Sequence, residues 1–328
     1  MRAFVVDEQD GQLTLGATDV EPHATDSDDV LVKVDLSGVN YKDALVAMAK
    51  SRVRRVPSLV GGVDAAGVIA ESLDPNLTVG TRVAVHGGNL GVGRDGGFAE
   101  YVFAPSRFIN VLPDSISTRH AMVIGTAGFS AMESVLALEA HGLVAGVEVL
   151  VTGATGGVGS LAITFLAARG YSPIASTGSP QESSWLKERG AARVIGRDEI
   201  SDKPDRVLAS ERWAGAIDCI GGDTLQQILR SLCYGGAVAA SGLVAGSDLT
   251  TTIYPFITRA VSLIGIDSVE ATASTRSRVW TALGQIAHKV DFAPLVDREV
   301  SLGHVADALE IVRKGETRGR ILVNPNKG

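Results

Sequence analysis

The sequence contains few of the side chains that build metal sites. It has only two cysteines, Cys219 and Cys233, among its 328 residues, so a four-cysteine zinc site is excluded. Neither a His-Glu-x-x-His nor a Cys-x-x-Cys motif occurs, and His86, His120 and His304 lack the spacing of metal ligands. Both cysteines lie in apolar surroundings, and we predict that they are small core residues. The sequence therefore predicts no metal site.

The chain also lacks an excess of positive charge and a long uninterrupted apolar segment. Its formal net charge is -7, which argues against a nucleic-acid-binding surface. No charge-free apolar run reaches the roughly 18 residues of a membrane-spanning helix, because the longest, from Ala121, contains Glu133 and Glu139. The N-terminus has no signal-peptide apolar region and becomes acidic at Asp7. We expect a cytoplasmic protein that acts on small molecules, not on nucleic acid or membranes.

Glycine, in contrast, is abundant, at 38 residues. Gly153, Gly156 and Gly159 separate a short apolar run at 147–151 from an Ala-rich run at 160–169. This pattern predicts a strand, a turn and a helix with the glycine spacing of a dinucleotide-binding fingerprint. Such glycines permit a tight turn, let backbone N–H groups approach a pyrophosphate at the helix N-terminus, and let the helix pack closely. Because the spacing departs from the strict G-x-G-x-x-G, a turn that binds nothing is the alternative.

Two domains are predicted from the change of pattern along the chain. Residues 1–120 contain short strands and turns, typical of a small β-rich barrel. Within 121–266, after a helix at 121–138, short strands alternate with helices, which predicts a doubly wound α/β fold with a parallel sheet covered on both faces. Helices at 274–287 and 303–313 and a strand at 320–323 are expected to return to the first domain. The predicted domains are therefore 1–120 with 267–328, and 121–266.

The strands expected in the β-rich domain lie at 30–36, 63–70, 82–85 and 98–103. Those expected in the parallel sheet lie at 147–151, 172–177, 193–195, 215–220, 237–241 and 262–266. Ligands of such a sheet bind at the carboxyl ends of its strands. The residues that we expect to hold a pyrophosphate are Thr155, Gly156, Gly157 and Val158.

The end of the second strand of this sheet indicates which cofactor binds. An NAD site usually has an acidic residue there, about 20 residues after the glycines, to bind the ribose 2′-hydroxyl. Here the strand ends in Thr177, Gly178 and Ser179, and the first acid is Glu182. The absence of a carboxylate fits the 2′-phosphate of NADP, which hydroxyl and N–H groups at 177–179 and the side chain of Arg197 could bind. An ordinary surface arginine is the alternative for Arg197.

Four further residues are candidates for the cofactor or substrate pocket. Leu243, Ile257 and Ser268 follow later strands and could form walls of a nicotinamide pocket, or could be ordinary packing and loop residues. Tyr41 lies in a polar cluster directly after a strand. It could donate a proton or contact the nicotinamide, and a half-buried surface tyrosine is the alternative.

A basic run occurs in this otherwise acidic chain. It consists of Lys50, Arg52, Arg54 and Arg55. These side chains could meet the phosphates of a substrate such as coenzyme A. A solvated surface is the alternative.

The whole chain resembles the medium-chain dehydrogenase/reductase superfamily, on its zinc-free quinone-oxidoreductase side. The motifs that carry this resemblance are 96–101 (Gly-Gly-Phe-Ala-Glu-Tyr), 153–159 and 319–323 (Gly-Arg-Ile-Leu-Val). Where zinc-dependent alcohol dehydrogenases have Gly-His-Glu, this chain reads Gly61-Gly62-Val63-Asp64, which implies that no catalytic zinc is bound. The resemblance implies a Rossmann domain and a GroES-like barrel.

More closely, the chain resembles the NADPH-dependent acrylyl-CoA reductase branch. The motifs lie at 40–45, 124–129, 213–218, 241–243, 255–257 and 265–269. The resemblance implies NADPH contacts at Tyr41, Thr155 to Val158, Thr177 to Ser179, Arg197, Leu243, Ile257 and Ser268. The branch commonly has Ser-Gly-Arg where this chain has Thr177-Gly178-Ser179, so the arginine that would clamp the 2′-phosphate is missing and Arg197 remains.

The resemblance implies reduction of an α,β-unsaturated thioester, acrylyl-CoA to propionyl-CoA, without zinc. Hydride from NADPH adds at the β-carbon, and a proton then reaches the α-carbon. We expect Tyr41 to be the hydrogen-bond or proton donor, with water as the alternative. An NADPH:quinone or enone reductase of broad specificity and a cofactor-binding protein without turnover are the rival hypotheses. The resemblance also implies a homodimer formed by edge pairing of the cofactor sheets.

Overall fold

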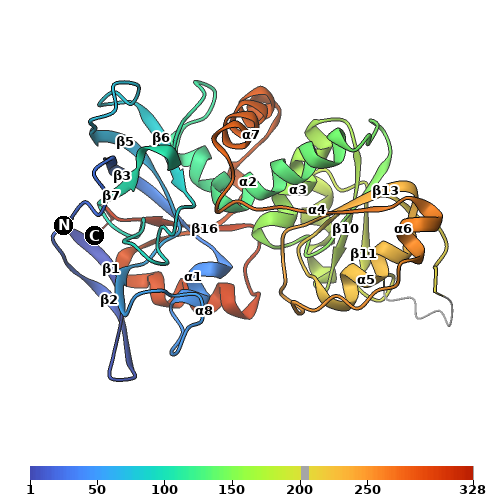
Figure 1. Ribbon diagram of the computed structural model, residues 1–328, viewed down its shortest axis with the longest axis horizontal. Coiled ribbons are helices and arrows are strands. Elements are labelled where there is room, and N and C mark those ends of the chain that lie inside the picture. Colours follow the sequence, from blue (N-terminus) through green and yellow to red (C-terminus); the bar gives the residue numbers. More distant parts are fainter. Residues whose placement is uncertain (201–206, 328) are drawn as a thin grey trace. The chain divides into compact units, whose positions relative to one another are not determined.

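The computed structural model of the protein describes residues 1–200 and 207–327, and these form two compact units (Figure 1). The terminal unit consists of Met1–Phe129 and the chain from Ser268 onward, and the central unit is Ser130–Asp267. The sequence analysis set the boundaries at residues 121 and 267. In the structure they lie at residues 130 and 268, and the first is shifted because helix α2, Thr118–Ala140, begins in the terminal unit and ends in the central unit.

The central unit is built on a six-stranded sheet in the order β11-β10-β9-β12-β13-β14, and every neighbouring pair is parallel. This order confirms the predicted doubly wound fold. The strands are short and mostly buried, as expected for a sheet covered on both faces. They are β9 (Glu148–Val151), β10 (Ser172–Thr177), β11 (Arg193–Gly196), β12 (Trp213–Asp218), β13 (Leu232–Ala240) and β14 (Ser262–Gly265).

Helices connect these strands and bury their apolar faces on the sheet. They are α3 (Gly157–Ala168), α4 (Ser183–Glu188), α5 (Gly222–Ser231) and α6 (Tyr254–Arg259). Helix α4 is short, because the chain first makes a 3-10 turn at Pro180–Glu182. Leu150, Trp213 and Ile228 belong to the core of this unit. Cys219 and Cys233 are free and only half-buried, so both are less buried than the core residues they were predicted to be. Cys219 directly follows β12, and Cys233 is the second residue of β13.

The terminal unit contains two sheets, one ordered β2-β1-β4 and one ordered β15-β16-β3-β5-β6-β8, with β7 paired to β3. The C-terminal β16 pairs with β3 through Ile321 and Val39, which joins the tail to the N-terminal strands. The sequence analysis did not identify β1, β2, β4, β8 or β15. The strands are β1 (Arg2–Gln9), β2 (Gln12–Asp19), β3 (Asp29–Val39), β4 (Ser58–Val60), β5 (Asp64–Glu71), β6 (Arg82–His86), β7 (Tyr101–Pro105), β8 (Ile109–Val111), β15 (Val296–Ser301) and β16 (Arg320–Asn324).

Three helices complete this unit beside α2: α1 (Tyr41–Val46), α7 (Ala273–Ile286) and α8 (Val305–Lys314). The first core cluster packs α8 against the sheets through Leu309, with Phe4 and Phe98 in an edge-to-face pair whose ring centroids lie 6.2 Å apart. A second cluster lies between β3, β5 and β6 and contains Val32 and Ile69. These apolar clusters hold the strand ends that carry the polar residues described below.

Helix α2 is kinked at Gly125, whose φ is 49° and ψ is -159°. A side chain there would be strained and would also contact the Asp64 carboxylate and the Arg320 guanidinium. By length and composition alone α2 is apolar enough to cross a membrane, but 78% of its apolar window is buried inside the protein. Core helices of globular proteins share these properties.

Candidate functional site

The turn between β9 and α3 in the central unit has the geometry of an anion-binding turn. The Ala154 N–H donates to the Ser176 carbonyl at 3.1 Å, which ties the turn to β10. Helix α3 starts directly after Gly156, and glycine has no side chain that could cap the helix. The first N–H groups of α3 therefore have no side-chain partner from the N-cap and can bind an anion. Gly159 has no room for a side chain, because a Cβ there would contact the Gly153 carbonyl oxygen. The predicted residues Thr155 to Val158 lie half-buried in this turn.

A buried carboxylate that the sequence analysis missed shapes the neighbouring loop. Asp218 ends β12, accepts from the Thr152 hydroxyl at 2.6 Å and accepts from the Gly221 N–H at 2.8 Å. The Thr152 hydroxyl oxygen in turn accepts from the Cys219 N–H at 3.0 Å. Burial raises the pKa of Asp218. These bonds fix the loop after β12 beside the glycine turn.

A cavity of about 550 Å³ opens at the ends of β10 and β11. It is lined by Thr177, Gly178, Pro180, Ser183, Val194, Ile195, Gly196, Arg197 and Asp198. The Ser179 N–H donates to the Thr177 hydroxyl at 3.0 Å. A Cβ on Gly178 would meet the Arg197 guanidinium, so this guanidinium lies over the strand end. The structure thus brings Thr177, Gly178 and Arg197 together.

The other predicted pocket residues are not gathered at this cavity. Leu243, after β13, is 61% exposed, and Ile257, in α6, is 69% exposed. Ser268 is half-buried at the start of the second segment of the terminal unit. Their proposed contacts with the nicotinamide stay predictions.

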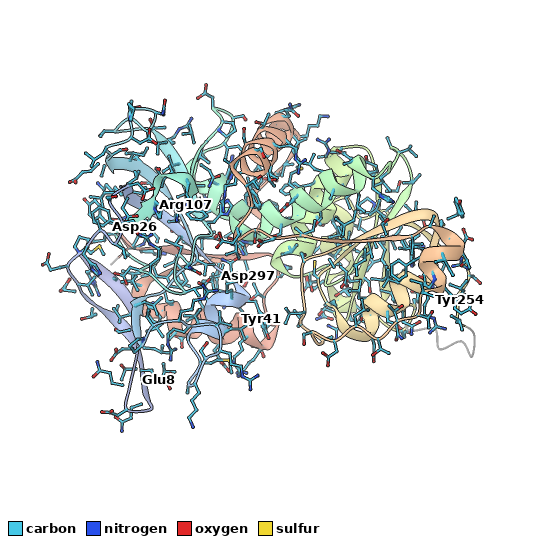
Figure 2. All side chains as sticks on the ribbon, in the orientation of Figure 1. Glu8, Asp26, Tyr41, Arg107, Tyr254 and Asp297 are labelled. Carbon is cyan, nitrogen blue, oxygen red and sulfur yellow. The ribbon has the colours of Figure 1, made fainter. Side chains whose placement is uncertain are left out.

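Tyr41, in the terminal unit, is the first residue of α1, and its side chain is 38% exposed (Figure 2). Asn40 is the N-cap, and its N–H donates to the Asp43 carboxylate at 2.7 Å in a capping box. Asp43 also accepts from the Val63 N–H at 2.8 Å. Its burial raises the pKa of Asp43 to about 7, although the bonds from Asn40 and Val63 act in the opposite direction. These buried hydrogen bonds therefore hold the first turn of α1, which carries Tyr41.

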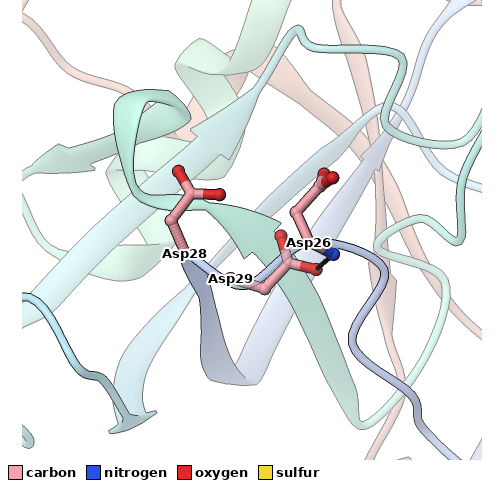
Figure 3. Close-up of side chains that lie close together, drawn as sticks. All are labelled: Asp26, Asp28 and Asp29. Atoms are coloured by element: carbon pink, nitrogen blue, oxygen red, sulfur yellow. Dashed lines mark hydrogen bonds between the residues drawn. The ribbon is translucent and has the colours of Figure 1, made fainter.

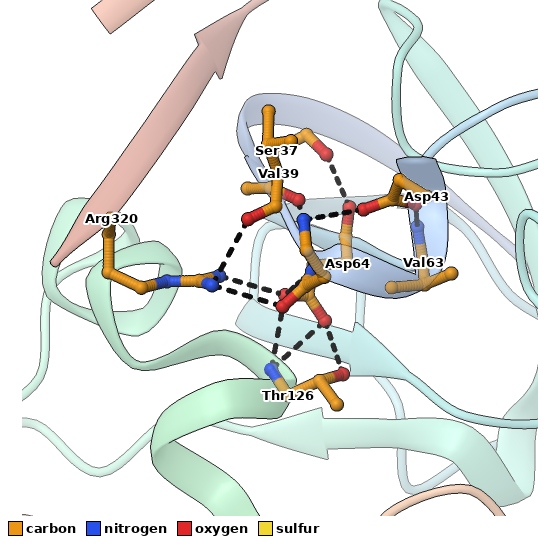
Figure 4. Close-up of polar contacts among 9 residues, drawn as sticks. Ser37, Val39, Asp43, Val63, Asp64, Thr126 and Arg320 are labelled. Carbon is orange, nitrogen blue, oxygen red and sulfur yellow. Dashed lines mark hydrogen bonds and ion pairs between the residues drawn. The ribbon is translucent and has the colours of Figure 1, made fainter. Parts of the chain in front are cut away.

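A buried ion pair lies next to this helix start (Figure 4). The Asp64 carboxylate accepts from the Asn40 amide at 2.8 Å, from the Thr126 hydroxyl at 2.5 Å and from the Arg320 guanidinium at 3.2 Å. Arg320 also donates to the Val39 carbonyl at 3.1 Å and to the Asn40 side-chain oxygen at 3.0 Å. The network joins β3, β5, α2 and β16. The Asn-x-x-Asp capping pattern was a usable sequence signal, but nothing in the sequence showed that Arg320 pairs with Asp64.

A second buried cation fixes the segment that follows Ser268. The Arg276 guanidinium donates to the Val269 carbonyl at 3.1 Å, to the Ala271 carbonyl at 3.1 Å and to the His86 carbonyl at 3.0 Å. Burial, and then the charge of Arg276, lower the pKa of His86 to about 3. His86 is therefore neutral near neutral pH and cannot serve there as an acid. The sequence analysis assigned nothing to His86 and did not identify Arg276.

The basic run is divided by the structure. The Arg54 side chain is 4% exposed, pairs with Glu8 and donates to the Val46 carbonyl at 2.6 Å. Arg54 is therefore a structural residue and not a phosphate ligand. Lys50, Arg52 and Arg55 are exposed and keep the interpretation given above. (Glu8 is labelled in Figure 2.)

Comparison with known proteins gives the following matches. Residues 26–114 match the alcohol dehydrogenase GroES-like domain, and residues 157–285 match the zinc-binding dehydrogenase family. The chain is 43% identical to a putative quinone oxidoreductase, YhfP, of Bacillus subtilis over 90% of both chains. It is 39% identical to the acrylyl-CoA reductase AcuI of Ruegeria pomeroyi over 91% of this chain and 90% of that one.

Solved structures of two such relatives are similar throughout. YhdH of Escherichia coli K-12 with bound NADPH has a TM-score of 0.93 and 37% identity, over 99% of this chain and 100% of that chain. Bacillus subtilis YhfP with NAD bound has a TM-score of 0.94 and 40% identity, over 98% of both chains.

The side chains of this chain do not fit the zinc of the matched family description. Among residues 1–200 and 207–327, the one group of three or more potential ligands close enough to share an ion is Asp26, Asp28 and Asp29 (Figure 3). Zinc prefers cysteine and histidine, and Arg94 already pairs with Asp29 at 2.6 Å and with Asp26 at 3.0 Å.

Proposed function

The chain belongs to the medium-chain dehydrogenase/reductase superfamily as a quinone-oxidoreductase-like oxidoreductase, and from this premise we propose that it reduces the double bond of an α,β-unsaturated acyl-CoA with NADPH. Acrylyl-CoA is the proposed substrate and propionyl-CoA the product. The observation that carries the proposal is the end of β10, which has no carboxylate and where the Arg197 guanidinium lies over Gly178. Full-length similarity to proteins named acrylyl-CoA reductase supports the substrate.

The central unit fits the cofactor. The turn residues Thr155 to Val158 would hold the pyrophosphate, and Arg197 would bind the 2′-phosphate in the cavity at the end of β10. When bound, NADPH supplies a hydride to the β-carbon while a proton goes to the α-carbon, so that the alkene is reduced and the nicotinamide is oxidised. The Asp218 bonds keep the loop after β12 in one conformation beside that turn.

The terminal unit supplies the donor. As the β-carbon gains the hydride, negative charge develops on the thioester oxygen, and a fixed hydrogen-bond donor stabilises it. We propose the Tyr41 phenol for this role, because it is exposed and its helix start is held by Asn40, Asp43 and Asp64. Lys50, Arg52 and Arg55 are proposed to meet the phosphates of coenzyme A.

The experiment follows loss of the absorbance of the reduced nicotinamide with acrylyl-CoA, with free acrylate and with a simple quinone, using NADPH and NADH. Turnover that requires the thioester and prefers NADPH supports the proposal. Turnover with quinone alone identifies the chain as a quinone reductase, the rival that similarity to YhfP favours. Binding of NADPH without turnover on any activated alkene identifies a cofactor-binding protein.

The donor role is tested with Tyr41→Phe at saturating NADPH. We expect kcat to fall about a hundredfold to a thousandfold, in the range found for removal of one such donor or proton-transfer group. Tyr234→Phe is the matched control, because Tyr234 is 74% exposed in the central unit. An unchanged kcat in Tyr41→Phe assigns the role to water.

We also propose a homodimer and a cytoplasmic location. β14 is the last strand in the order of its sheet, and Leu263 in that strand is 38% exposed. An edge strand of this kind offers unpaired backbone groups to a second copy. Analytical ultracentrifugation of the wild type and of Leu263→Lys tests the dimer, which we expect the lysine to dissociate.

A further inference from the structure

The cavity at the ends of β10 and β11 contains two opposite charges on adjacent residues. Arg197 is its one cationic lining residue and Asp198 its one anionic lining residue. Both side chains are exposed, and both follow β11 directly. The sequence analysis considered only the arginine, and no function proposed above uses the aspartate.

Contacts with two glycines show where these charges lie. A Cβ on Gly178 would meet the Arg197 guanidinium, with its Nη2 at 2.7 Å, so the guanidinium covers the position where an NAD site has its acidic residue. A Cβ on Gly196 would contact an Asp198 carboxylate oxygen, so the carboxylate folds back over the end of β11. Gly178 follows β10 and Gly196 is the last residue of β11, and these strands are paired with Thr177 as the register partner of Gly196. The two charges therefore face one strand-end cavity.

We propose that Asp198 is a specificity-determining residue that limits the preference of this chain for NADP(H) over NAD(H). The inference rests on the proposed use of a nicotinamide cofactor. A 2′-phosphate in the cavity is attracted by Arg197 and repelled by Asp198. A 2′-hydroxyl can instead donate a hydrogen bond to the Asp198 carboxylate, as it does to the acidic residue of an NAD site. The pair therefore admits both cofactors, with NADP(H) favoured.

The remaining groups at the cavity cannot decide the choice. Thr177 and Ser183 carry neutral hydroxyls, and Gly178 has no side chain. The Thr177 hydroxyl already accepts from Ser179, and the Ser183 hydroxyl donates to the Pro180 carbonyl at 2.7 Å. Hydroxyl groups bind either a phosphate or a ribose. Discrimination therefore depends on charge, and relatives of nearly equal similarity have been crystallised one with NADPH and one with NAD.

The test measures the Kd of the full chain for NADP⁺ and for NAD⁺ by titration calorimetry, without substrate or turnover. In Asp198→Asn we expect NADP⁺ to bind about two- to fivefold more tightly, the range of an exposed charge pair, and NAD⁺ to bind no more tightly than in the wild type. In Arg197→Gln we expect NADP⁺ to bind roughly tenfold or more weakly, with little change for NAD⁺. Glu199→Gln is the matched control, because it removes the same charge from an exposed residue that does not line the cavity.

The outcomes separate this inference from the proposed function. A higher NADP⁺/NAD⁺ affinity ratio in Asp198→Asn than in Glu199→Gln supports the role of Asp198. An equal ratio in the two variants, while the wild type binds NADP⁺, overturns that role and leaves the reductase proposal intact. A wild type that binds neither nucleotide overturns both. Raising the salt concentration should reduce the difference between Asp198→Asn and the wild type, because the effect is electrostatic.

Discussion

Among the described residues of the central unit, the buried polar side chains are hydroxyl groups and the carboxylate of Asp218, whereas the terminal unit buries Asp43, Asp64, Arg276 and Arg320. Burying a charge costs free energy unless a partner and hydrogen bonds compensate. The central unit avoids that cost, because the groups proposed to bind the cofactor lie on a backbone turn and at strand ends. The terminal unit accepts the cost. The Asp64–Arg320 ion pair holds the helix start of Tyr41, and the hydrogen bonds of Arg276 to three carbonyl groups hold the segment after Ser268.

The largest expected effect on the stability of either unit follows removal of the buried guanidinium of Arg320. In Arg320→Met the Asp64 carboxylate remains buried without its cationic partner, and we expect a loss of about 3–5 kcal/mol of stability in the terminal unit. Native-state hydrogen exchange of β3 and β16 measures this loss, and exchange in the central unit should change little. The exposed Arg298→Met is the control. Equal protection of β3 in both variants would contradict a stabilising role for the ion pair.

The next effect is a pH dependence of the free energy of unfolding, and it arises from Asp43. Burial raises its pKa in the folded protein to about 7, above the usual value of 3.8 for an aspartate. The folded protein therefore holds a proton that the unfolded chain releases. The resulting stabilisation is present in full below about pH 4 and is lost as the pH rises through about 7.

Asp43→Asn removes this titration. The wild type should accordingly exceed the variant in unfolding free energy by more at about pH 5 than at about pH 8. Urea unfolding at the two pH values measures the difference. A gap that stays constant with pH would show that Asp43 does not titrate in this range.

Replacement of Arg276 by lysine keeps the charge but loses the planar fork that reaches three carbonyl groups. We expect a loss of roughly 1.5–3 kcal/mol, the range for hydrogen bonds to a charged group. Peptides containing residues 268–271 should become more accessible to hydrogen exchange. If Ser268 contacts the nicotinamide, the Kd for NADPH rises as well. Unchanged exchange at 268–271 would remove the positioning role.

In the central unit, Asp218→Asn should lower the free energy of unfolding by about 1–3 kcal/mol. The new amide N–H₂ group would face the hydroxyl and N–H donors from which the carboxylate accepts hydrogen bonds. The loss should be smaller than that in Arg320→Met, since Asp218 is held by hydrogen bonds whereas Asp64 is held by an ion pair with Arg320. Hydrogen exchange of β12 and β9 measures it. A loss as large as that of Arg320→Met would abolish the distinction between the units.

The smallest effect on stability is expected at the exposed basic residues. Arg52→Ala should change the free energy of unfolding by less than about 0.5 kcal/mol, while raising the KM for acrylyl-CoA about two- to fivefold. Arg54→Ala should instead lower the free energy of unfolding and leave the KM unchanged, because Arg54 is buried against Glu8. Initial rates and urea unfolding of the two variants provide the contrast. Equal KM values for Arg52→Ala and the wild type would show that Arg52 does not bind the phosphates of coenzyme A.

The sequence predicted the central unit well because its information is local. The apolar run of β10 ends at Thr177 as expected, and the glycines at 153–159 mark the turn between β9 and α3 within one short segment. The terminal unit was less accessible, because its determining contacts join residues far apart in the chain. Arg320 and Asp64 are separated by 256 positions, and Arg276 and His86 by 190. No periodicity or spacing connects such pairs, so folding alone brings them together.

The most direct test of the account is the fate of the hydride. The full chain is incubated with acrylyl-CoA and NADPH deuterated at C4, in separate reactions for each face of the ring, and the propionyl product is analysed by mass spectrometry and NMR. The account predicts that one of the two deuterated cofactors transfers its deuterium to the β-carbon, and that the hydrogen gained at the α-carbon comes from solvent. A product without deuterium at the β-carbon from either cofactor, or no product at all, would contradict the assignment of the chain as an enoyl thioester reductase.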